Sequence, residues 1–497
     1  MPTRILIMVL MLTCSVSAYS ATEPLSLTLS EAIRMAVEKN LDVRAELYNP
    51  AAFEADIRRN RSIYDPLVTL KAEYDDSTIS PVGSATGIAN ESQSFLINSS
   101  ISRLLWTGAT VALNFNNSYT GSNAKIPEPN YWQTAFGATL IQPLLRNAGR
   151  ETTEIAITVS RLSKFAALEH FNTRLLNTVA QVRTEYFKLY SLREDMEVRK
   201  VSLELARKIL SDTQARVKAG VLPAMEILNA EFGAVTREKE LIDAERAVKD
   251  QMDVLKLLLQ LPAQTGELRI ADLPSRERYE AAEQEAIRKA LERPDIREQK
   301  HNLDIAERQT RVYNSKTRPD LSLTASAALT GLDNTYQRNL DKVFTFDYPA
   351  WSVGMVFSYP LGNNAAENDY RKSRLKAEQT SLQIRSLEEN AINEVRTSIR
   401  GIETGFKQIE VADRGRSFAE ERYRAFVRKN EVGLATTKDV LDVENDLAAA
   451  KSNQIKSLVG YASALTRYWQ VTGELLEREG VRVVEGDADK LYSAASR

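Results

Sequence analysis

The chain has 497 residues, of which 43% are hydrophobic and 27% are charged, and its formal net charge is −2. This composition is typical of a folded protein, and the nearly balanced charge excludes the basic field that attracts nucleic acid. Two histidines and one cysteine are too few for the usual metal centres, for histidine or cysteine catalysis, or for a disulfide framework. We therefore expect no metal, no cofactor and no enzyme activity.

Residues 1–20 have the pattern of a secretory signal peptide. Arg4 supplies the positive charge, residues 5–12 form an apolar run too short to cross a bilayer, and residues 16–20 contain two small-residue cleavage sites. The alternative is that Cys14 receives a lipid. No later run approaches the length of an apolar transmembrane helix. The sequence therefore predicts an exported chain that is periplasmic, secreted or built as an outer-membrane β-barrel.

The rest of the chain is an internal duplication. Residues 218–231 read KAGVLPAMEILNAE and residues 431–444 read EVGLATTKDVLDVE, so a glycine, an acid, a leucine and a glutamate recur in register. Each copy is predicted to contain a helix, strands, a long helix, a glycine turn and a second helix. The predicted organisation is a first repeat over 21–261, a connector over 262–280, a second repeat over 281–473 and a polar tail over 474–497.

Long helices are expected before each glycine turn, because no proline lies between Pro143 and Pro223 or after Pro360. At about 1.5 Å per residue, residues 152–216 would form a rod of about 100 Å, which is longer than a compact domain needs. In the second copy, bulky apolar residues recur at alternating spacings of three and four, as in a coiled-coil seam. These residues are Ile392, Val395, Ile399, Ile402, Phe406 and Ile409.

The segments between the helices alternate apolar and polar residues and contain many serines, threonines and asparagines. This pattern, with aromatic residues near the segment ends, indicates membrane strands that are apolar outside and polar inside. One alternative is a soluble sheet that caps a coiled coil. The first repeat has an additional hairpin, which we interpret as two further strands, with a plug or a surface loop as the alternatives. The candidate strands are 64–75, 92–104, 109–119 and 131–142 in the first repeat and 321–330 and 349–359 in the second.

The signal peptide, the duplicated unit and the repeated glycine-turn motif together resemble the TolC-like outer-membrane efflux protein family, over about residues 25–473. The resemblance implies an α+β membrane protein: a homotrimer whose β-barrel in the outer-membrane lipid is continued by a long periplasmic α-helical barrel. It also implies a passive exit duct for efflux or type I secretion, working with a periplasmic adaptor protein and an inner-membrane transporter. The sequence does not determine the cargo.

Association is also expected on physical grounds. Four or six strands cannot close a wide barrel, and an open sheet edge is not stable in lipid. The number three comes from the resemblance alone. The alternative function is that of a periplasmic coiled-coil scaffold or adaptor without a channel, which would be a soluble protein without barrel strands.

The resemblance places the two glycine turns at the periplasmic tip, where the duct closes. Gly220 and Gly433 suit turns that need a positive φ. Val221, Val432 and Leu434 match the segment that adaptor hairpins contact. The alternative interpretation is that the turns are ordinary helix caps.

Three acids near the turns are candidate gate and selectivity residues. Asp439 and Asp442 match the paired acids of the family, and three copies of each would form stacked anionic rings that favour cations. Their proximity is expected to raise their pKa values. Glu226 occupies the equivalent place in the first turn as a gate-bracing acid. The alternative for Asp439 is a local capping box with Thr436.

The chain departs from the better-known members of the family at the closed tip. Those members hold the tip with a basic residue and a tyrosine, and the matching positions here are Ala435 and Asn430. We therefore expect a different or a weaker latch, with Lys438, Lys429 and Arg428 as nearby candidates.

Overall fold

The computed structural model describes residues 25–80, 90–123, 129–262, 264–481 and 489–491. The expected signal peptide and Cys14 lie outside the described residues. The chain divides into two compact units. The first lies within residues 1–44, 175–286 and 395–482, and the second within residues 45–174, 287–394 and 483–497, so both repeats contribute to each unit.

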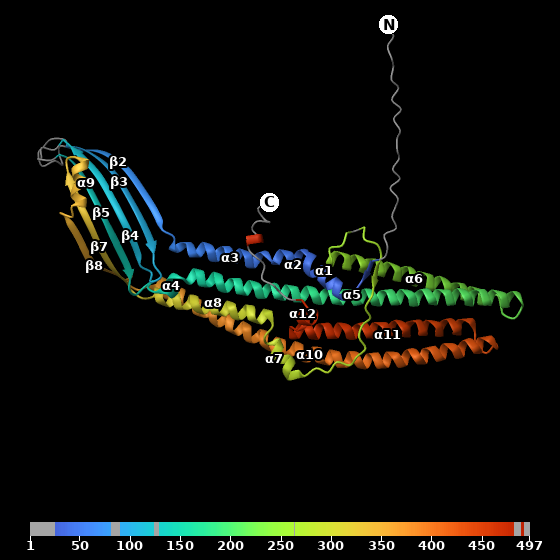
Figure 1. Ribbon diagram of the computed structural model, residues 1–497. Coiled ribbons are helices and arrows are strands. Elements are labelled where there is room, and N and C mark those ends of the chain that lie inside the picture. Colours follow the sequence, from blue (N-terminus) through green and yellow to red (C-terminus); the bar gives the residue numbers. More distant parts are fainter. Residues whose placement is uncertain (1–24, 81–89, 124–128, 263, 482–488, 492–497) are drawn as a thin grey trace, which may run out of the picture. The chain divides into compact units, whose positions relative to one another are not determined.

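The second unit contains an antiparallel six-stranded sheet with the order β2-β3-β4-β5-β7-β8 (Figure 1). Four of the strands come from the first repeat, so the additional hairpin belongs to the sheet rather than to a plug or a loop. The strands are β2 (Leu67–Ile79), β3 (Asn90–Leu104), β4 (Thr110–Ser122), β5 (Asn130–Pro143), β7 (Asp320–Asp333) and β8 (Pro349–Ser358).

The strand register separates an apolar face of the sheet from a polar face, because successive side chains of a strand point to opposite sides. The apolar face is the side of the sheet that carries Val111, Leu113 and Phe115 of β4, and the residues in register with them on β5 and β7 are apolar as well. On the polar face, Asn114 donates a hydrogen bond to Thr139 at 3.0 Å. Each face thus has the composition that the alternation in the sequence predicts.

Short helices accompany the sheet in this unit. The helix α9 (Tyr336–Phe344) joins β7 to β8 and packs against β5 and β7 (Figure 1). The other helical segments are α3 (Tyr48–Arg61), η1 (Ser62–Tyr64), α4 (Arg150–Thr153) and α8 (Pro294–Lys316). The β2–β3–β4–β5 segment starts and finishes at the same end of the strands, and so does the β7–β8 hairpin. Helices follow at that end, and α9 lies at the opposite end.

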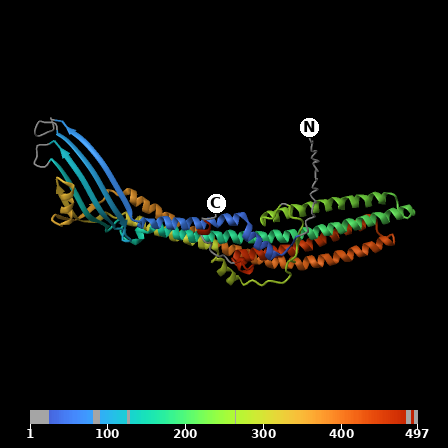
Figure 2. The same ribbon diagram turned by 45° about the horizontal axis from the view of Figure 1, so that its top comes forward.

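The first unit is built around two helical hairpins, α5–α6 and α10–α11, which turn at the same end in both views (Figure 2). Helix α5 (Ile155–Lys218) has 64 residues and α10 (Asn364–Glu431) has 68. Both helices also contribute residues to the second unit, as do α2 (Leu41–Glu46) and α7 (Glu283–Ala290). The remaining helices are α1 (Leu29–Lys39), α6 (Met225–Leu258), α11 (Thr437–Thr472) and α12 (Leu475–Arg478).

Within the ranges that the structure describes, none of these helices combines the length and the apolar composition required to cross a membrane.

The buried stripe of α10 differs in part from the seam that the spacing predicts. Val395, Ile402 and Ile409 are buried as expected, but the alternate positions of the stripe are the small residues Ser398, Gly405 and Ala412. A Cβ atom on Gly405 would lie 3.3 Å from the Cα atom of Tyr461 on α11. Small residues are therefore required here, because the two helices approach closely. The size of the apolar side chains alone did not predict which positions of α10 are buried.

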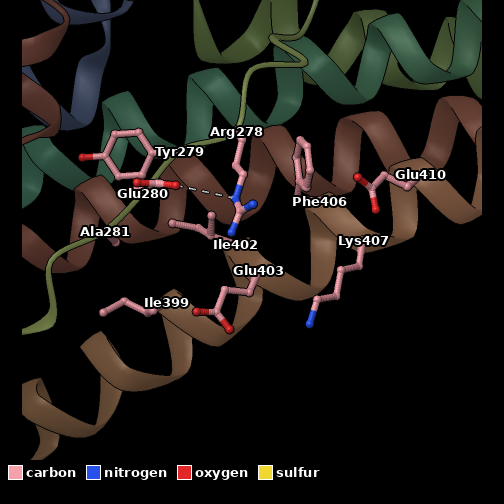
Figure 3. A pocket seen from close by; sticks show the side chains of 10 residues that line it. All are labelled: Arg278, Tyr279, Glu280, Ala281, Ile399, Ile402, Glu403, Phe406, Lys407 and Glu410. Carbon is pink, nitrogen blue, oxygen red and sulfur yellow. Dashed lines mark ion pairs between the residues drawn. The ribbon is translucent and has the colours of Figure 1, made fainter.

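The connector passes over Ile399 and Phe406, two of the bulky residues that the stripe leaves out (Figure 3). A pocket of about 410 Å³ lies where the connector passes α10, and Ile399, Ile402 and Phe406 form its apolar side (Figure 3). The guanidinium of Arg278 lies 6.0 Å from the centroid of the Phe406 ring and 4.0 Å from the Glu280 carboxylate. The polar connector is thus in contact with the helix rather than extended into solvent.

The connector also contains a strand that the sequence did not indicate. Strand β6 (Leu268–Ile270) pairs in parallel with β1 (Leu25–Leu27), which precedes α1. Tyr186 on α5 fixes this pair, because its buried hydroxyl donates to the Leu27 carbonyl at 2.8 Å and accepts from the Asp272 amide at 3.2 Å. Burial raises the pKa of Tyr186 to about 12, so the hydroxyl stays protonated. One side chain therefore joins the start of the first repeat, the connector and a long helix.

We expect Tyr186→Phe to lower the free energy of unfolding by about 1–3 kcal/mol, because the Leu27 carbonyl and the Asp272 amide lose their shared partner in a buried place. Denaturant unfolding of the detergent-solubilised protein measures this change. Tyr190→Phe is the control, since the Tyr190 ring only borders the same core, and it should cost less. Equal losses in the two variants would contradict the role of the Tyr186 hydroxyl.

Candidate functional site

The first predicted turn joins α5 to α6 as a Schellman motif. Gly220 has φ +74° and its amide donates to the Val217 carbonyl at 2.9 Å, while the Val221 amide donates to the Arg216 carbonyl at 2.9 Å. This pair of bonds satisfies the last carbonyls of α5 and requires a left-handed residue, which glycine adopts without strain. The Val221 side chain is 69% exposed.

The second turn, between α10 and α11, repeats this geometry. Gly433 has φ +78° and its amide donates to the Asn430 carbonyl at 3.1 Å, while the Leu434 amide donates to the Lys429 carbonyl at 2.8 Å. Val432 and Leu434 are 70% and 77% exposed. The recurrence of glycine in the two motifs therefore has a common backbone cause, and both turns present apolar side chains to the surroundings.

Asp439 forms the capping box that was the local alternative for this residue. Its carboxylate accepts from the Thr436 amide at 2.8 Å and from the Thr436 hydroxyl at 2.7 Å, and the Asp439 amide donates to that hydroxyl at 3.1 Å. The bonds from the Thr436 backbone and side chain lower the pKa of Asp439 below its ordinary value. The expectation of a raised pKa is therefore wrong for Asp439 in the single chain, because these donors stabilise the ionised carboxylate.

This lowered pKa gives the cap a defined pH dependence. A carboxylate that is more acidic in the folded chain than in the unfolded chain contributes stability above its ordinary pKa. That contribution is lost as the pH falls through the lowered value of the folded state. Asp439 thus stays charged at neutral pH.

The other two candidate acids lie in different surroundings. Asp442 is on the exposed side of α11, and the structure gives it no ion pair within the described ranges. Glu226 is in the first turn of α6 and is partly buried. Its Oε2 atom is buried without a hydrogen-bond partner among the described residues. The structure therefore places all three acids near the turns but brings none of them into contact with another.

Arg216 connects the two turns, a contact that the sequence did not reveal. Its Nη1 atom donates to the backbone carbonyl of Asn430 at 3.0 Å and to the side-chain carbonyl at 3.2 Å. The Asn430 amide group then donates to the Ala435 carbonyl across the second turn at 2.9 Å. The two positions that depart from the family pattern, Asn430 and Ala435, therefore bond to each other, and Asn430 also bonds to Arg216 of α5. Lys429, one of the expected substitutes, lies instead over the Phe426 ring.

A buried ion pair holds α6 against α11 further from the turns. Arg237 Nε donates to Glu444 at 3.2 Å and Arg237 Nη2 donates to the Leu441 carbonyl at 3.0 Å. The residues are 7% and 2% exposed. Gly233 allows this approach, since a Cβ atom there would lie 2.8 Å from the Leu441 side chain.

Glu444 is the last residue of the motif that recurs in the two copies, and its counterpart Glu231 is exposed. Likewise Leu441 is buried, whereas its counterpart Leu228 is 61% exposed. The recurrence identified these positions, but it could not show which copy is buried. Which copy is buried depends on how α6 packs against α11, where Arg237 contacts Glu444 and the Leu441 carbonyl.

Comparison with known proteins places the chain in a family. A sequence profile of outer membrane efflux proteins matches residues 32–259 and 286–474, with one match in each repeat. The pyoverdine export outer membrane protein OpmQ of Pseudomonas aeruginosa is 24% identical over 328 residues, which cover 61% of this chain and 64% of OpmQ. The outer membrane efflux protein BepC of Brucella suis is 20% identical over 383 residues, which cover 76% and 80% of the two chains.

A solved structure shows the same fold. The outer membrane channel CmeC of Campylobacter jejuni matches with a TM-score of 0.65 at 14% identity, covering 94% of this chain and 89% of CmeC. The chain therefore belongs to the outer membrane efflux protein family, a class of transport channels. It is an outer-membrane protein that extends into the periplasm, and the predicted α+β fold with an internal duplication is confirmed.

We expect Arg237→Met alone to destabilise the protein by about 3–5 kcal/mol, because Glu444 would remain buried without its partner. The double variant Arg237→Met/Glu444→Leu should recover most of this loss, since an apolar pair of similar size fills the same space. Denaturant unfolding of both variants tests the coupling. If the double variant is as unstable as the single variant, the ion pair with Glu444 does not explain the stabilising role of Arg237.

Proposed function

We propose that the protein is a passive exit duct that transports small molecules or proteins from the periplasm to the exterior. It acts as a homotrimer in a tripartite efflux pump or a type I secretion system. A periplasmic adaptor protein and an inner-membrane transporter are its partners, and the transporter supplies the energy. The family match in both repeats is the main support. The name of OpmQ assigns it to pyoverdine export, which favours a small-molecule cargo.

The sheet supports association into a closed barrel. Among the residues that the structure describes, strands β2 and β8 each have a hydrogen-bonded neighbour strand on one side only. Unpaired backbone groups are costly in hydrocarbon, so the β2 edge of one copy pairs with the β8 edge of the next until the sheet closes. The apolar face then contacts lipid, and the polar face lines the lumen.

The acids near the turns are proposed to form the periplasmic gate. Asp442 is exposed, so three copies contribute an anionic ring that favours cations over anions. Asp439, kept ionised by its cap, adds a second ring. The buried Oε2 atom of Glu226 has no partner among the described residues, which supports a contact for this acid in the assembled trimer.

The turns themselves are proposed to receive the adaptor. Val221, Val432 and Leu434 are exposed apolar side chains grouped at one end of the helices. Such a group at the tip of a hairpin is typical of a protein contact site. Gly220 and Gly433 keep these side chains in place through the Schellman geometry.

The duct is tested by measuring the mass and the conductance of the purified full chain. A trimer in detergent that forms ion-conducting pores in a planar bilayer is the expected result. A mock purification from cells without the protein is the control. A soluble monomer without conductance would contradict the duct and favour the coiled-coil scaffold.

We expect Asp442→Asn to lower the ratio of cation to anion permeability, because the variant removes three charges from the entrance. The reversal potential across a KCl gradient measures this ratio. The matched control is Arg422→Gln/Asp446→Asn, which removes an exposed ion pair of 2.8 Å about one helical turn from Asp442 and leaves the net charge unchanged. An unchanged ratio in Asp442→Asn, or an equal fall in both variants, would remove the assignment.

A further inference from the structure

Helix α9 lies on the apolar face of the sheet, at the ends of the strands that are remote from the long helices (Figures 1 and 2). The register places Thr134 and Gly331 opposite each other, two residues beyond Phe136 and therefore on the same face. The side chains of Asn339 and Val343 on α9 are buried against this surface. The helix thus covers the side of the sheet that the proposed function turns toward lipid.

The surface under α9 is a polar interruption of the apolar face. Asn117 and Thr134 are paired there, and Thr134 donates to Asn117 Oδ1 at 2.7 Å. Asn339 Nδ2 donates to the Thr134 hydroxyl at 2.5 Å, and both residues are fully buried. Polar groups without partners are costly in hydrocarbon. Asn339 therefore supplies the partner that lipid cannot.

A glycine makes the close approach of α9 possible. A Cβ atom on Gly331 would lie 2.2 Å from the Asn339 carbonyl oxygen and 3.0 Å from Val343. At the start of the helix, the Tyr336 ring packs edge-on against Trp132, with 5.0 Å between the ring centroids. The position of α9 is therefore fixed by specific contacts along its length.

The remaining surface of α9 changes from polar to aromatic along the chain. Gln337, Arg338 and Asp341 are exposed on the helix. At its end, Phe344 and Phe346 are each 67% exposed, and the chain then enters β8. A polar segment followed by exposed aromatic rings is typical of the boundary between water and lipid hydrocarbon.

We propose that α9 and residues 344–348 form an anchor on the outside of the barrel, in contact with outer-leaflet lipid. The polar side of α9 lies among the headgroups, and the aromatic rings of Phe344, Phe346 and Tyr348 reach the edge of the hydrocarbon. This inference depends on the proposed barrel. It adds that the barrel has a second layer at its outer rim, which sets the depth of the sheet in the membrane.

Lipid suits this surface better than a neighbouring copy of the chain. Helix α9 contacts β5 and β7, whereas the edges that meet other copies are β2 and β8. The exposed aromatic residues also continue the apolar face, since Trp351 on β8 is 79% exposed on that face. The anchor and the apolar face therefore form one continuous surface.

The depth of α9 can be measured with nitroxide labels on single cysteines in the full chain, with Cys14→Ser as the background. The trimer is reconstituted in phospholipid vesicles, and power saturation compares accessibility to oxygen and to a water-soluble nickel chelate. We expect the label at Phe344→Cys to show a several-fold higher oxygen-to-nickel ratio than the label at Gln337→Cys. Gly331→Val, which displaces α9, should abolish that difference.

Two reference positions separate the anchor from the barrel itself. Val353→Cys reports the apolar face, and Asn116→Cys reports the polar face. A lipid-exposed Val353 label with a nickel-accessible Phe344 label would overturn the anchor and leave the duct intact. A Phe344 label inaccessible to both reagents would also overturn it, in favour of a contact between copies. A nickel-accessible label at Val353 would overturn the barrel.

Discussion

The outer edges of β2 and β8, which have no neighbouring strand in the described part of the chain, are the constraint on which the rest of the structure depends. The sheet of six strands has an apolar face that suits lipid, but its two open edges carry backbone groups that are costly to leave unpaired in hydrocarbon. In the proposed assembly, further copies of the chain pair with these edges, and the polar face lines the lumen. The family match and the outer-membrane location agree with this physical requirement.

The duplication supplies similar parts that do different work. Both turns use the same Schellman geometry, yet only the second is followed by a capping box, between Thr436 and Asp439. Glu444 is buried against Arg237, whereas Glu231 of the first copy is exposed. Gene duplication therefore preserved the backbone of the hairpins while the contacts between them became asymmetric.

Much of the fold was accessible from the pattern of residues, because helix and strand periods are local properties. The long helices, the alternating strands and the two glycine turns all follow from spacing and from the absence of proline. The incorrect predictions concern positions whose burial depends on a neighbouring helix or segment. The sequence assigned Ile399 and Phe406 to the seam, but the buried positions beside them are Ser398 and Gly405. At Gly405 the cause is the close approach of Tyr461, and the connector passes over Ile399 and Phe406. The sequence did not indicate strand β6, because a strand of three residues is too short to show the alternation of apolar and polar side chains.

The sequence by itself determined the duplication, the export pattern, the class of the fold and the turns, since these depend on neighbours in the chain. Tertiary structure alone decided how the candidate site is held together. It showed that Arg216 donates a hydrogen bond to Asn430 and so connects the two turns. It also showed that the Asp439 carboxylate accepts hydrogen bonds from Thr436 in a capping box. It also placed α9 over Thr134. These pairs are far apart in the sequence or depend on side-chain direction, and no local pattern contains that information.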